Sequence, residues 1–177
     1  MFTIGHSTHP IDAFVEILQA HGVRQLVDIR TIPKSRHNPQ FNQETLSASL
    51  RKQKIAYVHM KDLGGLRRPR PDSPNAGWKN SSFRGYADYM QTEPFKEALE
   101  KLITLSKKIP TAIMCAEALP WKCHRSLVSD SLATKGTQVE HLLSPKKRQL
   151  HTLTSFAKVQ NGELLYPKDK QQLELFR

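Results

Sequence analysis

The stretch TAIMCAEALPWKCHRSLVSDSLA, residues 111–133, holds a strand, a polar loop and a helix in direct succession. Its first five residues are apolar or β-branched and end at Cys115, which predicts a short buried strand. Apolar residues from Leu127 onward recur at helical spacing until Gly136, which predicts a helix over residues 126–133. A strand that leads through a short loop into a helix is typical of α/β domains.

The same alternation extends over most of the chain. Apolar runs predict four further strands, at residues 2–4, 26–29, 55–60 and 139–143. Helical spacing predicts three further helices: one capped by Ser7 or Thr8 and ended by Gly22, one over residues 43–53, and one from Arg84 onward with Pro94 as a candidate interruption. We therefore expect a single α/β domain over residues 1–145, with a mainly parallel sheet and helices on both faces. Residues 146–177 form a basic C-terminal extension that is interpreted as a tail, a docked hairpin or both.

Composition narrows the class of protein. A chain of 177 residues is large enough for one substantial core, and none of its apolar runs approaches the length of a membrane span. Two cysteines do not suggest a disulfide framework, and the first residues already have a strand pattern and no secretory signature. We therefore expect a cytoplasmic protein with reduced thiols that does not enter a membrane.

The formal net charge is +11, and much of it is concentrated in one region. Residues 51–84 carry nine basic side chains against two acidic ones, and the Gly- and Pro-containing part at 62–82 is predicted to be a long surface loop. Such a field attracts polyanions, so nucleic acid or another phosphate-bearing ligand is the expected partner. The alternative is a solvated basic surface with no ligand.

Polar residues follow several of the predicted strands. In open parallel sheets ligands bind beyond the carboxyl ends of the strands. The segments at these ends are Gly5-His6-Ser7, Asp28-Ile29-Arg30, His59-Met60-Lys61 and Cys115-Ala116-Glu117. The following segment at residues 33–42 is dense in hydrogen-bonding groups and is predicted to be a substrate loop.

The predicted catalytic residues are Glu117, His124, Arg125, Asp28 and Arg30. In this set a carboxylate activates water or orients a neighbour, while the imidazole and guanidinium stabilise charge. The predicted binding residues are His6, Ser7, Arg36, Asn38, Arg84, Tyr86, Cys115 and Cys123. Tyr86 or Trp121 is expected to stack on a base. The alternatives are that Cys115 is an ordinary buried strand residue, and that Asp28 and Arg30 form an ion pair that closes a turn.

Four of these residues could also bind a metal ion. Cys115, Cys123, His124 and His6 are all acceptable zinc ligands. However, the spacing Cys-x7-Cys-His matches no common zinc pattern, and adjacent residues seldom bind the same ion. We therefore expect no metal and no cofactor.

Several motifs occur in a recognisable order along the chain. They are Thr3-Ile4-Gly5-His6-Ser7, Val27-Asp28-Ile29-Arg30, Pro33-x-Ser35-Arg36, Asn38-Pro39-x-Phe41, Leu63-Gly64-Gly65, Phe83-Arg84-Gly85-Tyr86 and Cys115-x-Glu117-x5-Cys123-His124-Arg125. Together, over roughly residues 1 to 145, they resemble the bacterial and archaeal family known as domain of unknown function 488. This resemblance implies a compact α/β domain and a shared polar site, but no established reaction. A weaker likeness to rhodanese-type sulfurtransferases is limited because Cys115 and Arg125 are ten positions apart, with a glutamate and a second cysteine between them.

Charge and site together favour an enzyme that acts hydrolytically on a nucleic acid or nucleotide. Base excision of the kind found in DNA repair is one example, since it needs a flipped base and a carboxylate. One alternative is a non-catalytic nucleic-acid-binding module. The other is a thiol-based sulfurtransferase or redox protein.

Overall fold

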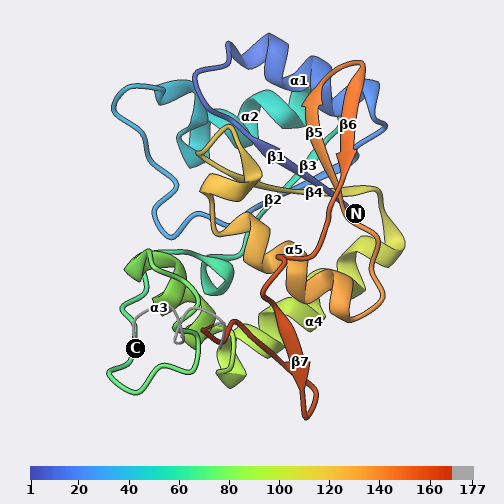
Figure 1. The fold of residues 1–177 in the computed structure, drawn as a ribbon. Helices are drawn as coiled ribbons and strands as arrows, with labels where there is room; N and C mark the ends of the chain where they lie inside the picture. Colours follow the sequence, from blue (N-terminus) through green and yellow to red (C-terminus); the bar gives the residue numbers. More distant parts are fainter. Residues whose placement is uncertain (169–177) are drawn as a thin grey trace.

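A six-stranded sheet forms the centre of the molecule, and the computed structural model describes residues 1–168 (Figure 1). The strands lie in the order β3-β2-β4-β1-β5-β6, and every pairing is parallel except the last. Their bounds are β1 Phe2–Gly5, β2 Gln25–Asp28, β3 Ala56–His59, β4 Thr111–Cys115, β5 Glu140–Ser144 and β6 Lys147–Leu150. The central strands are fully buried because helices cover both faces of the sheet.

Two groups of helices enclose the sheet (Figure 1). On one face α1 (Ile11–Ala20) and α2 (Gln43–Lys52) share a core with Leu26 and Met114. On the other face α4 (Glu93–Lys108) and α5 (Arg125–Thr134) pack with α3 (Ser81–Tyr89) around Val27 and Ile113. Short 3-10 turns occur at η1 Pro39–Phe41, η2 Lys61–Leu63 and η3 Pro120–Lys122. Over residues 1–168, no helix combines the length and apolar character that crossing a membrane requires.

The predicted fold class is confirmed: one α/β domain with a mainly parallel sheet and helices on both faces. The break near Pro94 is also present, because α3 and α4 are separate helices. The predicted cap of α1 is wrong. Pro10 occupies the N-cap position without a side-chain hydrogen bond, and Ser7 adopts a left-handed backbone with φ of 45° three residues earlier.

Much of the C-terminal extension packs on the domain. β6 pairs with β5, and the hairpin of β7 (Lys158–Gln160) and β8 (Glu163–Leu165) leads to Tyr166, which is completely buried. The backbone N–H of Tyr166 donates to Asn75 at 2.9 Å. A docked hairpin is therefore present within residues 146–168. Residues 169–177 of the extension lie outside the described part of the chain, and the division at residue 145 stays a prediction.

Candidate functional site

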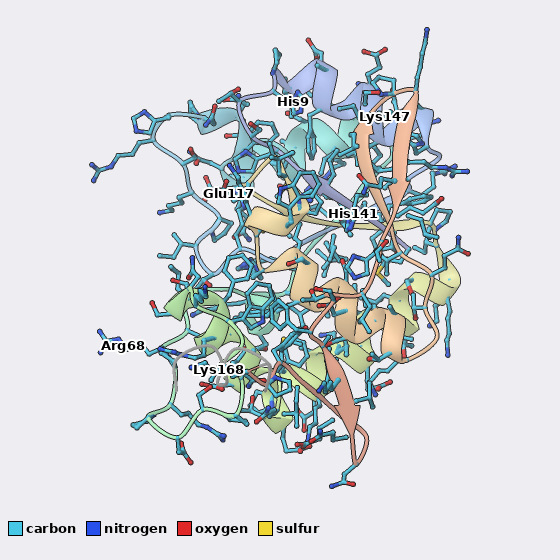
Figure 2. All side chains as sticks on the ribbon, in the orientation of Figure 1. His9, Arg68, Glu117, His141, Lys147 and Lys168 are labelled. Carbon is cyan, nitrogen blue, oxygen red and sulfur yellow. The ribbon has the colours of Figure 1, made fainter. Side chains whose placement is uncertain are left out.

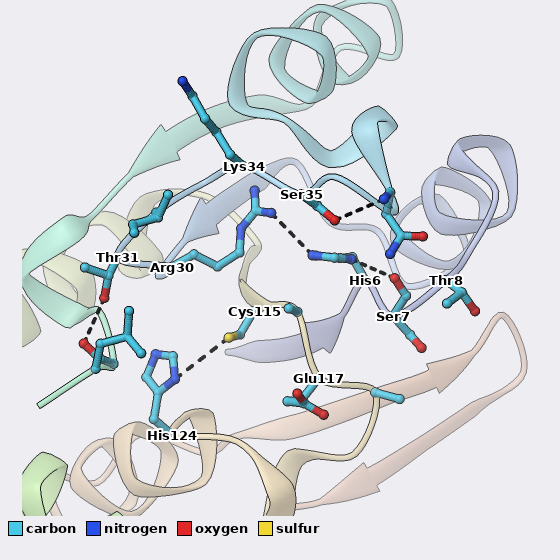
Figure 3. A pocket seen from close by; sticks show the side chains of 16 residues that line it. His6, Ser7, Thr8, Arg30, Thr31, Lys34, Ser35, Cys115, Glu117 and His124 are labelled. Carbon is cyan, nitrogen blue, oxygen red and sulfur yellow. Dashed lines mark hydrogen bonds between the residues drawn. The ribbon is translucent and has the colours of Figure 1, made fainter. Parts of the chain in front are cut away.

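A cavity of about 540 Å³ opens at the carboxyl ends of β1, β2 and β4 (Figure 3). These three strands are adjacent in the sheet, so their polar end residues meet at one edge. The cavity is lined by His6, Ser7, Thr8, Arg30, Thr31, Ile32, Lys34, Ser35, Asn38, Gly65, Leu66, Cys115, Ala116, Glu117, Ala118 and His124. The expectation that a ligand site forms at the strand ends therefore has a cavity to match it.

Arg30 forms one wall, and the buried Asp28 lies behind it. The Nε and Nη2 groups of Arg30 donate to the buried carboxylate of Asp28, and Nη2 also donates to the carbonyl of Phe41 at 2.8 Å. The hydroxyl of Tyr57 donates to Asp28 at 2.8 Å. Burial and the charge of Asp28 raise the pKa of Tyr57, so this donor keeps its proton. Asp28 is thus occupied on both oxygens, which suits it to fixing Arg30 better than to taking a proton from water.

His6 holds the other end of Arg30. The Nδ1 of His6 lies 2.9 Å from the carbonyl oxygen of Ser7, which only accepts, so Nδ1 carries the proton. The Nε2 lone pair then accepts from Nη1 of Arg30 at 3.3 Å. Burial lowers the pKa of His6, which favours this neutral form, and the ring stacks on Phe41 with centroids 4.3 Å apart. His6 therefore orients Arg30.

Cys115, Cys123 and His124 meet beside the cavity. The Nδ1 of His124 lies 3.8 Å from Sγ of Cys115 and 3.7 Å from Sγ of Cys123. Its Nε2 lies 3.2 Å from the carbonyl oxygen of Ile29. A carbonyl only accepts, so Nε2 carries the proton and Nδ1 turns its lone pair toward the two sulfur atoms. Three groups that donate electron pairs therefore face one another at the end of β4.

The backbone explains how two adjacent residues reach the same point. The 3-10 turn η3 returns the chain toward β4, and Cys123 follows it with an extended backbone. His124 already has helical angles, at φ of −57° and ψ of −13°, one residue before α5. Side chains of adjacent residues point to opposite sides only while the backbone stays extended. The change of backbone at this point brings both side chains together, which the adjacency of the two residues in sequence does not predict.

The two thiols perturb one another. The neighbouring Cys123 thiol, together with burial, raises the pKa of Cys115. Burial opposes ionisation of Cys123 as well, but its contacts with Cys115, His124 and Arg125 outweigh burial and lower the pKa of Cys123. Negative charge therefore resides more readily on Cys123, whose sulfur also receives the backbone N–H of Arg125 at 3.5 Å.

Arg125 lies behind the cavity wall, whereas Glu117 borders the cavity. Arg125 is buried, and its guanidinium donates to the carbonyl oxygens of Glu117 and Ala118 and to Thr3 Oγ1. It therefore fixes the loop after β4 from behind and is absent from the cavity wall. The side chain of Glu117 is exposed and borders the cavity (Figures 2 and 3). Gly5 permits this arrangement, because a Cβ there would overlap the carbonyl oxygen of Glu117.

Other predicted residues lie elsewhere. Tyr86 is 1% exposed and donates to the carbonyl of Leu63 at 2.7 Å, so the prediction that it stacks on a base is wrong. Arg36 and Arg84 do not line the cavity, whereas Ser7 and Asn38 do. Trp121 is exposed but borders a separate cavity of about 230 Å³.

Some cavity residues were absent from the predicted site. Lys34 and Ser35 lie in the segment predicted to be a substrate loop, so their position was foreseeable. Ile32 and Leu66 are 61% and 80% exposed and lie on the cavity wall. Leu66 also has a left-handed backbone at φ of 60°. The only sequence signal for Leu66 is the preceding Gly64-Gly65 pair, because exposure of an apolar residue is a tertiary property.

Fold and cavity together define an α/β domain with a polar ligand-type cavity at the carboxyl edge of its sheet. The family model described as Domain of unknown function DUF488 matches residues 10–132, and the chain belongs to this family. The match includes the segment from Cys115 to Arg125. Neither the curated proteins nor the solved structures contain a match to the chain.

Proposed function

We propose that the protein is an enzyme that hydrolyses a bond in a nucleotide or nucleic-acid substrate bound in this cavity. One observation carries the proposal: the exposed carboxylate of Glu117 borders the same cavity as the cations of Arg30 and Lys34. Such a cavity offers a base for water next to positive charge for a phosphate group.

The phosphate side of the cavity is provided by Arg30 and Lys34. The contacts of Arg30 with Asp28, Phe41 and His6 use four of its five N–H groups, so one on Nη1 is left to a ligand. Lys34 is exposed and adds a second positive charge. Arg68 extends into solvent from the basic loop (Figure 2), where it can contact a longer polyanion. Binding is therefore expected to weaken with salt.

The apolar side of the cavity is provided by Ile32 and Leu66. Their exposed side chains can cover the face of a base, which takes over the role predicted for Tyr86. Burial of such a face by two aliphatic side chains favours binding without distinguishing one base from another. Substrate choice would then depend on the groups nearer to Arg30.

Glu117 is the residue proposed to act as general base. Its side chain takes part in none of the ion pairs formed within residues 1–168, so the carboxylate is free to accept a proton. It takes a proton from water as the water oxygen attacks the substrate, and the departing group leaves with the bonding electrons. Arg125 contributes indirectly, because it holds the carbonyl of Glu117 in place.

The proposal is tested by incubating the protein with nucleotides and with intact and damaged single- and double-stranded nucleic acids, followed by product analysis. Once a substrate is found, Glu117→Gln is expected to lower kcat about 10²–10⁴-fold with unchanged folding. Glu16→Gln is the matched control, since Glu16 is an exposed glutamate on α1 outside the cavity. Unchanged activity of Glu117→Gln would eliminate the proposed base.

The same experiment separates two alternatives. A non-catalytic binding module would bind nucleic acid at low salt, yield no product and be indifferent to Glu117→Gln. A thiol-based enzyme is favoured by one observation, the close approach of Cys123 to Cys115, which lines the cavity. It would lose activity on Cys115→Ser while Glu117→Gln stays active.

A further inference from the structure

The cluster of Cys115, Cys123 and His124 plays no part in the proposed hydrolysis. Its two Sγ atoms and one imidazole nitrogen all lie within 4.8 Å of one another. The lone pair of Nδ1 faces the sulfur atoms, because Nε2 donates to Ile29. A buried group of two thiols and a neutral imidazole has the ligand types that zinc prefers.

We propose that Cys115, Cys123 and His124 bind one Zn²⁺ ion whose fourth position opens into the cavity. This site does not depend on the substrate class proposed above. Two thiolates and one neutral histidine give the ligand set a charge that balances the ion. Sites with three protein ligands and an open position are typical of catalytic rather than structural zinc.

The two nitrogen-to-sulfur distances match tetrahedral coordination. Zinc binds sulfur at about 2.3 Å and imidazole nitrogen at about 2.0–2.1 Å, so tetrahedral geometry separates the two ligand atoms by about 3.6 Å. The observed separations from Nδ1 of His124 are 3.8 Å to Cys115 and 3.7 Å to Cys123. The imidazole therefore already lies at coordination distance from each sulfur atom, and the two sulfur atoms lie within 4.8 Å of each other. Preorganisation of this kind keeps the cost of binding low.

Neighbouring groups support the ligands in the way that metal sites require. A metal-binding histidine commonly donates its other N–H to a carbonyl or carboxylate, which fixes the ring and its tautomer. The contact from Nε2 of His124 to Ile29 does this at 3.2 Å. The N–H of Arg125 points to Sγ of Cys123 at 3.5 Å and stabilises charge on that sulfur.

Space for the fourth ligand lies on the cavity side. Cys115 and His124 line the cavity, and Cys123 does not. Gly65 borders the same space, and a Cβ at that position would approach Nδ1 of His124 to 3.2 Å. A water molecule at the open position would become markedly acidic, since zinc lowers the pKa of bound water to about 7. It would lie in the cavity that Glu117 also borders.

The test is metal analysis of the full-length protein, purified with a non-thiol reductant and without chelator. Inductively coupled plasma mass spectrometry is expected to find one zinc per chain. Cobalt titrated into the metal-free protein is expected to give the intense visible bands of tetrahedral Co²⁺ and a thiolate charge-transfer band, and zinc should abolish both. This readout needs neither a variant nor a substrate.

Variants then assign the ligands. Cys115→Ser and Cys123→Ser are expected to remove the charge-transfer intensity of their own sulfur and to weaken zinc binding at least about 100-fold. His124→Ala should weaken binding likewise, whereas the control His37→Ala, at an exposed histidine outside the cavity, should not. The proposal is overturned if reduced wild-type protein gives no thiolate–cobalt band. It is equally overturned if mass spectrometry shows that Cys115 and Cys123 rest as a disulfide that prevents metal binding.

Discussion

Two histidine clusters contact Arg125, one at its backbone N–H and the other at its guanidinium. They differ in how many of their polar atoms form hydrogen bonds within the protein. At the cavity, His124 has one ring nitrogen bound to Ile29 and directs the other toward two sulfur atoms. Deeper in the molecule, His141 is bound on both nitrogens, to Thr3 at 2.8 Å and to His151 at 3.0 Å. The first cluster leaves electron pairs available, and the second uses them within the protein.

The deeper cluster forms a directed chain of hydrogen bonds. Arg125 donates to Thr3, whose hydroxyl donates to His141, which donates to His151, which donates to Asp130 at 2.8 Å. One proton on each ring satisfies every contact. The positive charge of Arg125 and the negative charge of Asp130 then lie at opposite ends of the chain.

Asp130 also ties the C-terminal segment to the domain. Its carboxylate accepts from the backbone and hydroxyl of Thr154 and from the hydroxyl of Tyr166 at 2.8 Å. A closed network of this kind indicates a structural role, whereas unused electron pairs beside a cavity indicate a role toward a ligand. Histidine content alone therefore does not distinguish the two clusters, but the fate of each ring nitrogen does.

The largest expected effect is on the deeper cluster of Thr3, His141, His151 and Asp130, called the closed cluster from here on. Asp130→Ala leaves four donors without their acceptor, on the half-buried His151 and Thr154 and on the buried Tyr166, so we expect a loss of about 3–5 kcal/mol in the free energy of unfolding. Urea denaturation followed by circular dichroism measures it. At temperatures where the variant remains folded, its zinc content should equal that of the wild type. A loss below about 1 kcal/mol would show that the network does not hold the C-terminal segment.

The closed cluster should also make the stability of the folded protein depend on pH. Burial, followed by electrostatic interaction with His151, lowers the pKa of His141 from 6.5 to about 4. Above pH 6.5 the ring is neutral in both states. Between about pH 6.5 and 4 the unfolded chain binds a proton and the folded protein does not, so stability falls as pH falls, by about 3 kcal/mol in total.

Urea denaturation of wild-type protein and His141→Gln between pH 4 and 7.5 isolates this contribution. Burial lowers the pKa of His6 too, so the quantity to compare is the difference in unfolding free energy between the two proteins. That difference should shrink as pH falls through the stated window. A constant difference would mean that His141 titrates alike in the folded and unfolded states.

The smallest expected effect is on the open cluster, the group of Cys115, Cys123 and His124 beside the cavity. In metal-free protein, His124→Asn removes one hydrogen bond to Ile29 and should cost about 1 kcal/mol of stability. His151→Asn is the matched substitution in the closed cluster and should cost several times more, because two buried partners lose their contact. Equal losses of unfolding free energy in the two variants, measured by urea denaturation, would show that the two clusters contribute alike to stability.

The sequence predicts the strands and helices well because each is short, strongly patterned and bounded by glycine, proline or polar residues. It also places polar residues at the strand ends, where the cavity lies. The order of the strands is not predictable in this way, because parallel pairs such as β1 and β4 join distant parts of the chain. The cavity is therefore foreseen only in outline.

The direction in which a polar side chain points is equally hard to predict from sequence. Tyr86 and Arg125 carry polar groups that suit binding, yet both groups contact backbone carbonyls inside the molecule. Whether a long polar side chain turns inward depends on acceptors from other segments. The convergence of Cys123 and His124 likewise depends on a local change of backbone that residue spacing alone does not indicate.

The most direct test of the open cavity as the working site is a nuclear magnetic resonance titration of isotope-labelled protein. The probes are adenosine monophosphate and a short single-stranded oligonucleotide, at low salt. Amide shifts are expected at the cavity, in residues 6–8, 31–32, 34–35 and 116–118, with none around His141 and His151. Shifts confined to the closed cluster, or no shift with either probe, would contradict the assignment of the working site to the carboxyl edge of the sheet.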